Sequence, residues 1–224
     1  MTAHIRVLYG NIAGRRRVPR LRNLVKNRRP ELVVLTEAYH VRVFLRLLCT
    51  LYGYRLKHPG RRHGAEAPDI AVMVRRDGVI VGRWFRKMLR VWWGPFRYPK
   101  SKRRPRVYQI LQVRFHGVLW PLYLLHWPPG GPSGGVLTRG ANAGAWAESM
   151  KDFTAWLAAV EAGAGIGDAN ANRKQLNRLL PRWVRVRMSS GVDAVMSKGL
   201  HTSVEHLNSP RGMHGWAIFT LTKK

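Results

Sequence analysis

Short apolar segments, each followed by a polar side chain, recur along the 224-residue chain and constrain its fold more than any other feature. Residues 30–37 (Pro-Glu-Leu-Val-Val-Leu-Thr-Glu) form one such segment, which ends in the carboxylate of Glu37. A continuous apolar run of this length is typical of a strand that is buried on both faces. Similar segments cover residues 5–12 and 118–126, with Asn11 and His126 near their ends. We therefore expect a layered protein in which several strand ends present polar groups.

Residues 165–172 (Gly-Ile-Gly-Asp-Ala-Asn-Ala-Asn) form the most informative of these segments. Small residues before a carboxylate fit a short buried strand. The side chains of Asp168 and Asn170 would then leave the strand end in one direction, because strand side chains alternate between faces. Such a pair can hold a metal-bound water or a phosphate oxygen. The alternative is a turn rich in Gly and Asn, and this segment alone leaves both interpretations open.

The periodicity of the remaining apolar residues predicts a mixture of helices and strands. Helices are expected to start at Pro19 and to cover residues 44–51 and 145–160. Further strands are expected over residues 107–115, 183–188, 192–196 and 214–221, whereas residues 171–181 read as irregular. This order of elements indicates a mixed α/β layout, and we expect one domain over residues 1–224.

Two turns are predicted to connect hairpins. The pair Asp77-Gly78 is a strong turn signal, so residues 69–75 and 79–81 are expected to pair across it. Residues 107–115 are expected to pair with residues 118–126 across His116-Gly117.

The charge of the chain points to a polyanionic partner. It has 40 Lys and Arg residues but only 11 Asp and Glu residues, which gives a formal net charge of +29 and a pI near 11.7. Such an excess is typical of nucleic-acid binding and sometimes of binding to an anionic membrane. An Arg-rich coding bias is the alternative source of part of the charge. We expect nucleic acid, most plausibly DNA, and no membrane as the partner.

Basic residues gather in two segments that are candidates for phosphate contact. Residues 84–106 interleave Trp, Phe and Tyr with Lys and Arg, and such a segment can neutralise phosphates while its rings stack on bases. The alternative is that the rings belong to the core and the cations to a solvated face. The predicted nucleic-acid-binding residues are Arg15, Arg16, Lys100, Lys102, Arg103 and Arg104.

The cysteine content and the hydropathy exclude several other classes of protein. The single cysteine, Cys49, excludes an internal disulfide and a zinc site built from cysteines. The first residues lack the apolar block of a secretory signal, and no apolar run approaches the roughly 20 residues that span a bilayer. A cytoplasmic monomer is therefore expected.

The polar residues at the strand ends have the chemistry that metal-assisted phosphodiester hydrolysis needs. A hard cation such as Mg²⁺ takes carboxylate oxygens, and a neutral imidazole can remove a proton from water. Any one of these residues could be an ordinary hydrogen-bonded polar group, but the combined pattern is harder to dismiss in a chain with only 11 Asp and Glu residues. The candidates are Asn11, Glu37, His126, Asp168, Asn170, Asp193 and His214.

In this order the motifs resemble those of the endonuclease/exonuclease/phosphatase superfamily, which includes deoxyribonuclease I and the apurinic-site endonucleases. The resemblance runs from Arg6 to Leu221, and its most specific motif, Gly-Asp-x-Asn, is matched by residues 167–170. The other matches are Asn11 in the first strand, Glu37 after its apolar strand, His126 before Trp127-Pro128, the late Asp193, and His214 before the last strand.

The resemblance implies a deoxyribonuclease I-like α/β fold, in which a two-sheet β-sandwich is flanked by helices and the active site lies at one end. It also implies a Mg²⁺ or Mn²⁺ ion held by Glu37 with help from Asn11. The implied activity is a metal-dependent phosphodiester hydrolase, most plausibly a nuclease that acts on DNA.

The resemblance further implies roles for the remaining candidates. Asp168 and Asn170 would orient the attacking water and the scissile phosphate. His214, held by Asp193, would act as a base or as a phosphate-polarising cation. His126 would contact a phosphate oxygen or protonate the leaving group.

Two positions depart from the family pattern. The usual Ser-Asp-His before the last strand reads Gly-Met-His here, and Met213 cannot bind a hard cation. Ala13 stands where the apurinic-site enzymes tend to have an acid. The alternatives to an active nuclease are a catalytically weakened nucleic-acid-binding module and a phosphatase or phospholipase of the same fold.

Overall fold

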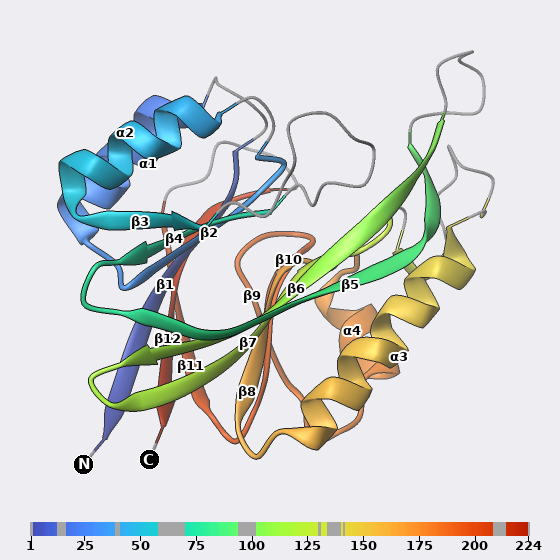
Figure 1. The fold of residues 1–224 in the computed structure, drawn as a ribbon. Helices are drawn as coiled ribbons and strands as arrows, with labels where there is room; N and C mark the ends of the chain where they lie inside the picture. Colours follow the sequence, from blue (N-terminus) through green and yellow to red (C-terminus); the bar gives the residue numbers. More distant parts are fainter. Residues whose placement is uncertain are drawn as a thin grey trace.

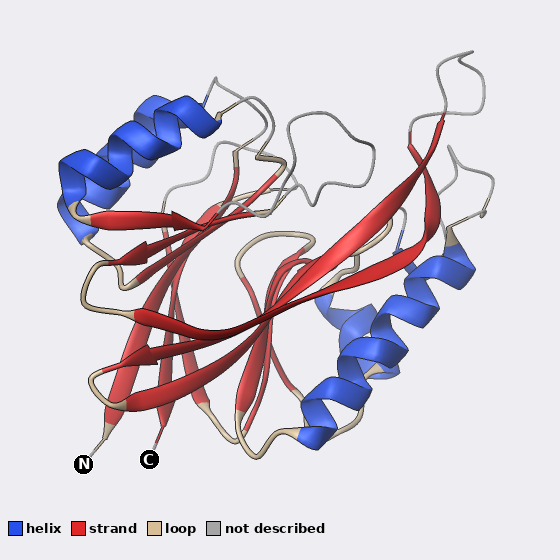
Figure 2. Ribbon diagram, viewed as in Figure 1, coloured by secondary structure: helices blue, strands red, loops and turns tan. Residues whose placement is uncertain are grey.

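The protein consists of two six-stranded mixed sheets that pack face to face, with helices on the outer faces (Figures 1 and 2). The computed structural model describes residues 2–12, 17–38, 41–57, 70–93, 102–129, 131–133, 140, 142–207 and 214–223, with the backbone alone for residues 84–93 and 102–108. This architecture confirms the predicted two-sheet sandwich flanked by helices.

The two sheets share the same number of strands but differ in connectivity. The first sheet has the order β11 (His201–His206), β12 (Trp216–Lys223), β1 (Ala3–Asn11), β2 (Leu32–Thr36), β4 (Ala71–Arg75) and β3 (Tyr54–Lys57). The second has the order β5 (Val79–Trp93), β6 (Lys102–Phe115), β7 (Val118–His126), β8 (Gly163–Asp168), β10 (Asp193–Lys198) and β9 (Arg185–Met188). Strands β5 and β6 are the longest of the described strands, and their hairpin reaches beyond its neighbours (Figure 1).

Three apolar layers hold these elements together. Helices α1 (Val18–Arg28) and α2 (Arg42–Tyr52) cover the first sheet, and α3 (Ala143–Ala159) and α4 (Arg173–Leu179) cover the second. The alternation of strand side chains explains why one strand serves two layers. In β1, Val7 packs between the sheets, whereas Leu8 packs under the first pair of helices.

The turn signals at Pro19, Gly53 and Gly117 operate as expected. Helix α1 has Pro19 in its first turn, where a missing backbone N–H costs nothing. Helix α2 ends at Gly53, whose φ of 75° is open to glycine. His116 and Gly117, with φ of 48° and 79°, connect β6 to β7, so the predicted hairpin is confirmed.

The predicted pairing of residues 69–75 with 79–81 is wrong. The turn at Asp77-Gly78 exists, with Gly78 N–H donating to the Arg75 carbonyl at 2.9 Å, but β4 lies in the first sheet and β5 in the second. Gly78 packs against the ring of Phe115, and a Cβ atom at this position would lie 2.0 Å from the ring. The glycine therefore allows the chain to cross between the layers rather than fold back on itself.

Residues 171–181 are also not irregular, because they contain helix α4. Its start is fixed by a capping box: the Gln175 amide donates to Asn172 Oδ1 at 3.0 Å, and the Asn172 amide donates to Gln175 Oε1 at 2.9 Å. The Asn-x-x-Gln spacing was visible in the sequence and is the signal that predicts this helix start. Within the described residues, no helix is long and apolar enough to cross a membrane.

Candidate active site

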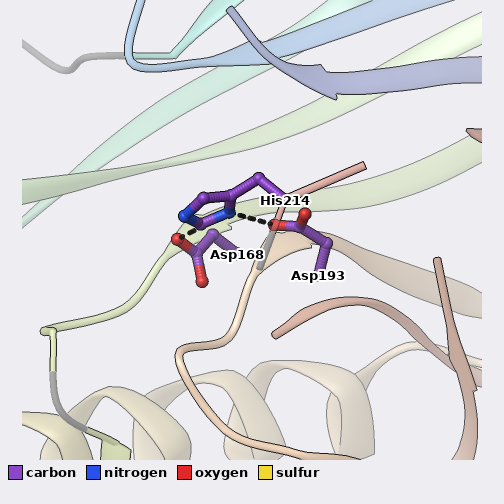
Figure 3. Close-up of side chains that lie close together, drawn as sticks. All are labelled: Asp168, Asp193 and His214. Carbon is purple, nitrogen blue, oxygen red and sulfur yellow. Dashed lines mark hydrogen bonds and ion pairs between the residues drawn. The ribbon is translucent and has the colours of Figure 1, made fainter. Parts of the chain in front are cut away.

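The candidate residues come together because six strands present their ends at one end of the sandwich. Strands β1 and β2 run parallel, and so do β7 and β8, with His126 opposite Asp168. Strands β10 and β12 run antiparallel to β8 and β1 and therefore start where those strands end. Asp168, Asp193 and His214 offer ligand atoms that all lie within 4.8 Å of one another (Figure 3).

Asp193 is fully buried at the start of β10, and both of its carboxylate oxygens are occupied. Oδ1 accepts the hydroxyl of Tyr9 at 2.9 Å and lies 3.3 Å from Nδ1 of His214. Oδ2 accepts the hydroxyl of Ser190 at 2.7 Å and the amide of Gly215 at 3.2 Å. A carboxylate offers about four acceptor positions, so little capacity remains for a cation. We therefore assign Asp193 to positioning rather than to metal binding.

His214 is the exposed member of this cluster, with 23% of its side chain accessible. The hydrogen bond from Nδ1 to Asp193 raises the pKa of His214, and the charges of Asp168, Asp193 and Glu37 raise it further against the effect of burial. Because Nδ1 is directed at Asp193, Nε2 is the ring atom left to meet a substrate. The arrangement favours the imidazolium form, which donates from both nitrogens.

Asp168 lies at the end of β8 and is almost completely buried. Its Oδ1 accepts the amide of Asn170 at 2.8 Å, and its Oδ2 lies 3.4 Å from Nε2 of His126 and 3.8 Å from Nδ1 of His214. Two imidazoles thus lie within ion-pair distance of one carboxylate oxygen, His126 being the nearer of the two.

Asn170 reaches this place by a turn, not by strand alternation. Strand β8 ends at Asp168, and Asn170 has a φ of 49°, so the expectation that the two side chains share a strand face is wrong. The side-chain amide of Asn170 donates to the carbonyl of Trp127 at 2.8 Å. Gly131 packs so closely that its Cβ would lie 2.3 Å from the Asn170 carbonyl. Strained backbone of this kind persists only where its surroundings fix it.

Tyr9 joins the two sheets inside the site, a role that sequence reasoning missed. Its buried hydroxyl donates to Asp193 Oδ1 at 2.9 Å and lies 3.0 Å from the hydroxyl of Thr36. Burial and the charges of Asp193 and Asp168 hold the pKa of Tyr9 well above its ordinary value, so the phenol stays protonated. A tyrosine on an alternating apolar strand looks like a core residue, and Tyr9 is one as well.

Asn11 is the last residue of β1 and pairs with Thr36 at the end of the parallel strand β2, and Glu37 follows Thr36. Glu37 is half-buried, and within the described residues its carboxylate makes no hydrogen bond or ion pair. It lies close enough to His214 to influence its pKa. An acid with uncommitted oxygens beside the amide of Asn11 fits a hard cation, which prefers such oxygen ligands.

Several predicted residues lie partly or wholly outside the described part of the chain. Arg15, Arg16, Lys100 and Met213 are not among the described residues. Lys102, Arg103 and Arg104 are in strand β6, but their side chains are not described. Their contact with nucleic acid stays a prediction.

Comparison with known proteins gives a match in structure. No protein-family model matches the sequence, and no curated protein matches it either. TDP2 from D. rerio, complexed with a single-strand DNA product, superposes with a TM-score of 0.69 at 12% identity, over 99% of this chain and 100% of that chain. Truncated TDP2 from Caenorhabditis elegans gives a TM-score of 0.66 at 14% identity, over 97% of both chains.

A bacterial structure agrees with these two. An endonuclease/exonuclease/phosphatase family protein from Bacteroides thetaiotaomicron gives a TM-score of 0.67 at 12% identity, over 100% of this chain and 96% of that chain. The fold extends over nearly the whole chain in each comparison, as the sequence motifs predicted. The chain therefore has the fold of the endonuclease/exonuclease/phosphatase superfamily.

Proposed function

We propose that the protein is a metal-dependent phosphodiester hydrolase that cuts nucleic acid, with DNA as its preferred substrate. One observation carries the proposal: Asp168, Asp193 and His214 converge at the end of the sandwich, and the nearby carboxylate of Glu37 makes no hydrogen bond or ion pair with the described residues. Buried acids whose only charged partners are histidines are uncommon in a core, and titratable clusters of this kind gather at functional sites.

The residues divide the reaction between them. The oxygen of a water molecule, oriented by Asp168, forms a bond to phosphorus and gives up a proton to the Asp168 carboxylate, while the bond to the leaving oxygen breaks. His126, whose Nε2 lies 3.4 Å from Oδ2 of Asp168, donates a proton to the leaving oxygen. His214 presents Nε2 as a donor to a non-bridging phosphate oxygen, where negative charge develops. Asp193 keeps the ring in that orientation.

A divalent cation such as Mg²⁺ would supply charge stabilisation on the phosphate when bound. Glu37 and Asn11 would hold it, since Asn11 ends β1 beside Thr36, the residue that precedes Glu37. Asp168 is the other acid that is not saturated by donors.

Nucleic acid is the substrate that the charge supports. A formal charge of +29 attracts a polyanion strongly, and the D. rerio structure of this fold was solved with a single-strand DNA product. The long β5–β6 hairpin carries Lys102, Arg103 and Arg104 beyond the edge of the sandwich (Figure 1). Binding should weaken steeply as salt rises, because counterions are released.

Plasmid nicking tests the proposal. Purified protein is incubated with supercoiled plasmid and Mg²⁺ or Mn²⁺, beside the variants Asp168→Ala and Glu205→Ala. Glu205 is a surface acid paired with Arg28, so its variant removes the same charge away from the site. We expect nicking by the native protein and by Glu205→Ala, and none by Asp168→Ala. Equal nicking by all three proteins would contradict the proposal, and tight binding without nicking would identify a nucleic-acid-binding module.

A further inference from the structure

Large apolar side chains are exposed mainly on one helix of the described structure. Seven such side chains are exposed there, and four of them lie on α2: Val43, Phe44, Leu47 and Leu51, with 77%, 38%, 55% and 58% of their surface accessible. The other three, Val79, Val81 and Trp183, lie on other elements. Concentration on one eleven-residue helix is what a binding surface produces, whereas scattered exposure is ordinary.

Helix α2 therefore has two apolar faces. Leu45, Leu48 and Cys49 are buried, where they pack under the first sheet. Phe44, Leu47 and Leu51 recur at spacings of three and four residues and form a second stripe on the other side. A surface helix needs only one apolar face to pack on its sheet. Packing against the first sheet therefore does not account for the exposed Leu47 and Leu51.

This second stripe borders an open groove between α1 and α2. The groove has a volume of about 640 Å³. Its walls are the first turns of α1 and the outer side of α2: Val18, Pro19, Arg22, Asn23, Phe44, Leu47, Leu48 and Leu51. Arg22 is held at the groove by its Nε, which donates to the hydroxyl of Tyr52 at 3.3 Å.

Both helices are free of acidic residues. Helix α1 has four cations, and α2 has two: Arg20, Arg22, Lys26, Arg28, Arg42 and Arg46. A molecule that lies in the groove meets apolar side chains, Arg22 on the α1 wall, and the exposed Arg42 and Arg46 beside the α2 stripe, whereas Arg28 is paired with Glu205. A binding partner that complements this groove needs an apolar ridge with acidic residues on either side.

We propose that this groove binds an amphipathic helix of a partner protein, whose apolar ridge enters between α1 and α2 and whose acidic residues face the arginines. Helix-in-groove recognition uses anchors at the same spacing as the α2 stripe. The concave shape disfavours a flat bilayer, because three of the four exposed side chains line the walls of the groove rather than a protruding surface. Leucine side chains also offer nothing to a nucleic-acid backbone.

Helices α1 and α2, which line the groove, lie on the outer side of the first sheet (Figure 1), whereas Asp168, Asp193 and His214 cluster at the strand ends (Figure 3). The proposal is therefore independent of the proposed hydrolase activity. Plasmid nicking and partner binding can fail separately.

Fluorescence anisotropy with designed peptides provides the test. The probe is a fluorescein-labelled, lactam-bridged helical peptide with Leu at positions i, i+3, i+4 and i+7 of each repeat and Glu at the solvent-facing positions. A scrambled peptide of the same composition and a peptide with Lys in place of Glu serve as controls. We expect saturable binding of the first peptide alone, with a Kd of roughly 1–100 µM.

Variants of the protein locate the binding. Leu47→Glu and Leu51→Glu, both at exposed positions that leave the core intact, should weaken binding by about tenfold or more. Val79→Glu changes a side chain of similar exposure outside the groove and should leave the Kd within about twofold. Circular dichroism establishes that each variant is folded.

Three results would overturn the proposal. The first is the absence of saturable binding at about 1 mM peptide. The second is equal binding of the scrambled peptide, or equal binding by Leu47→Glu and Val79→Glu. The third is co-sedimentation of the native protein, but not of Leu47→Glu, with phosphatidylserine–phosphatidylcholine vesicles, which would assign the stripe to a membrane.

Discussion

A glutamate flanks each end of strand β2, and the two glutamates have opposite electrostatic surroundings. Glu31, before the strand, accepts the backbone amide of Arg6 at 2.8 Å and a guanidinium N–H of Arg75 at 2.7 Å. Glu37, after the strand, lies close enough to His214 to raise the pKa of its imidazole, and the other acids beside His214, Asp168 and Asp193, are paired with no lysine or arginine in the described structure. A chain with 40 Lys and Arg residues could have neutralised both ends.

The difference separates acids that stabilise the fold from acids that serve the site. Two guanidinium groups satisfy Glu31 directly, and the hydroxyl of Tyr54 completes this end by donating to the carbonyl of Pro30 at 2.6 Å. Asp193 instead receives neutral donors and one histidine. Neutral donors hold a carboxylate in place without cancelling its charge. The site end therefore keeps more negative charge than the Glu31 end, which suits the cation that we propose there.

The largest effect is expected from Asp168→Asn. The amide keeps the shape of the side chain but cannot orient water or share a proton with His126, so turnover should fall by about 10²–10⁴-fold. The free energy of unfolding should stay the same or rise, since a buried negative charge near Asp193 is removed. Single-turnover cleavage of labelled DNA and urea denaturation measure the two quantities.

If Asp168→Asn lost turnover and unfolding free energy together, the distinction between the two ends of β2 would not hold. A matched variant, Glu31→Gln, makes the same chemical change at the other end of β2. It should retain the turnover of the native protein for each folded molecule. A large loss of turnover in Glu31→Gln would show that the two ends act together.

The sequence carried most of the information about the layers and about the identity of the site residues. Glu37 and Asp168 could be found because each follows an apolar run, and parallel strands bring such ends to one edge. Helix α1 could be found from Pro19 and its apolar spacing. These features are local, so local patterns predict them.

The sequence failed where an outcome depends on distant packing. Asp77-Gly78 predicts a turn, but the turn leads from β4 in one sheet to β5 in the other, where Gly78 packs against the ring of Phe115, far along the chain. Tyr9 looks like a core residue until Asp193 meets it from the other sheet, 184 positions away. The left-handed Asn170 is likewise set by Gly131 and Trp127. Long-range contacts of this kind leave no periodic signal.

The second effect in size is the loss of stability in Glu31→Gln. Removing the charge leaves Arg6 and Arg75 without their shared acceptor, and this should cost about 1–3 kcal/mol of unfolding free energy. Glu205→Gln is the control, because Glu205 and its partner Arg28 are both 49% exposed, and a surface pair contributes about 0–1 kcal/mol. Urea denaturation at neutral pH compares the variants. Equal losses of unfolding free energy in Glu31→Gln and Glu205→Gln would show that Arg6 and Arg75 stabilise Glu31 no more than a surface pair would.

Two buried tyrosines allow a finer test of the same distinction. Tyr9→Phe removes a donor from Asp193 and should lower turnover by about tenfold, because His214 is then held less firmly. Tyr54→Phe removes the bond to Pro30 and should lower stability while leaving turnover unchanged. The activity of Tyr9→Phe should also depend on pH differently from that of the native protein. If both variants lost only stability, Tyr9 would be a structural residue like Tyr54.

The smallest effects, opposite in sign at the two ends, concern the pH dependence of stability. Burial tends to raise the pKa of Glu31, but hydrogen bonds and charge from Arg6 outweigh it and lower the pKa below its ordinary 4.5. Its contribution is therefore complete above that value and disappears as the pH falls through the lower value of the folded state. The pKa of His214 is raised above 6.5, chiefly by Asp193, so its contribution is complete below 6.5 and disappears as the pH rises through the folded-state value.

Unfolding free energies measured across this pH range for the native protein, Glu31→Gln and His214→Gln resolve the two contributions. The difference between the native protein and Glu31→Gln should narrow on acidification, and the difference between the native protein and His214→Gln should narrow at alkaline pH. Curves that narrow in the same direction would contradict the assignment, because they would mean that one kind of charge pairing governs both ends of β2. Opposite curves would follow directly from arginines at one end and unneutralised carboxylates at the other.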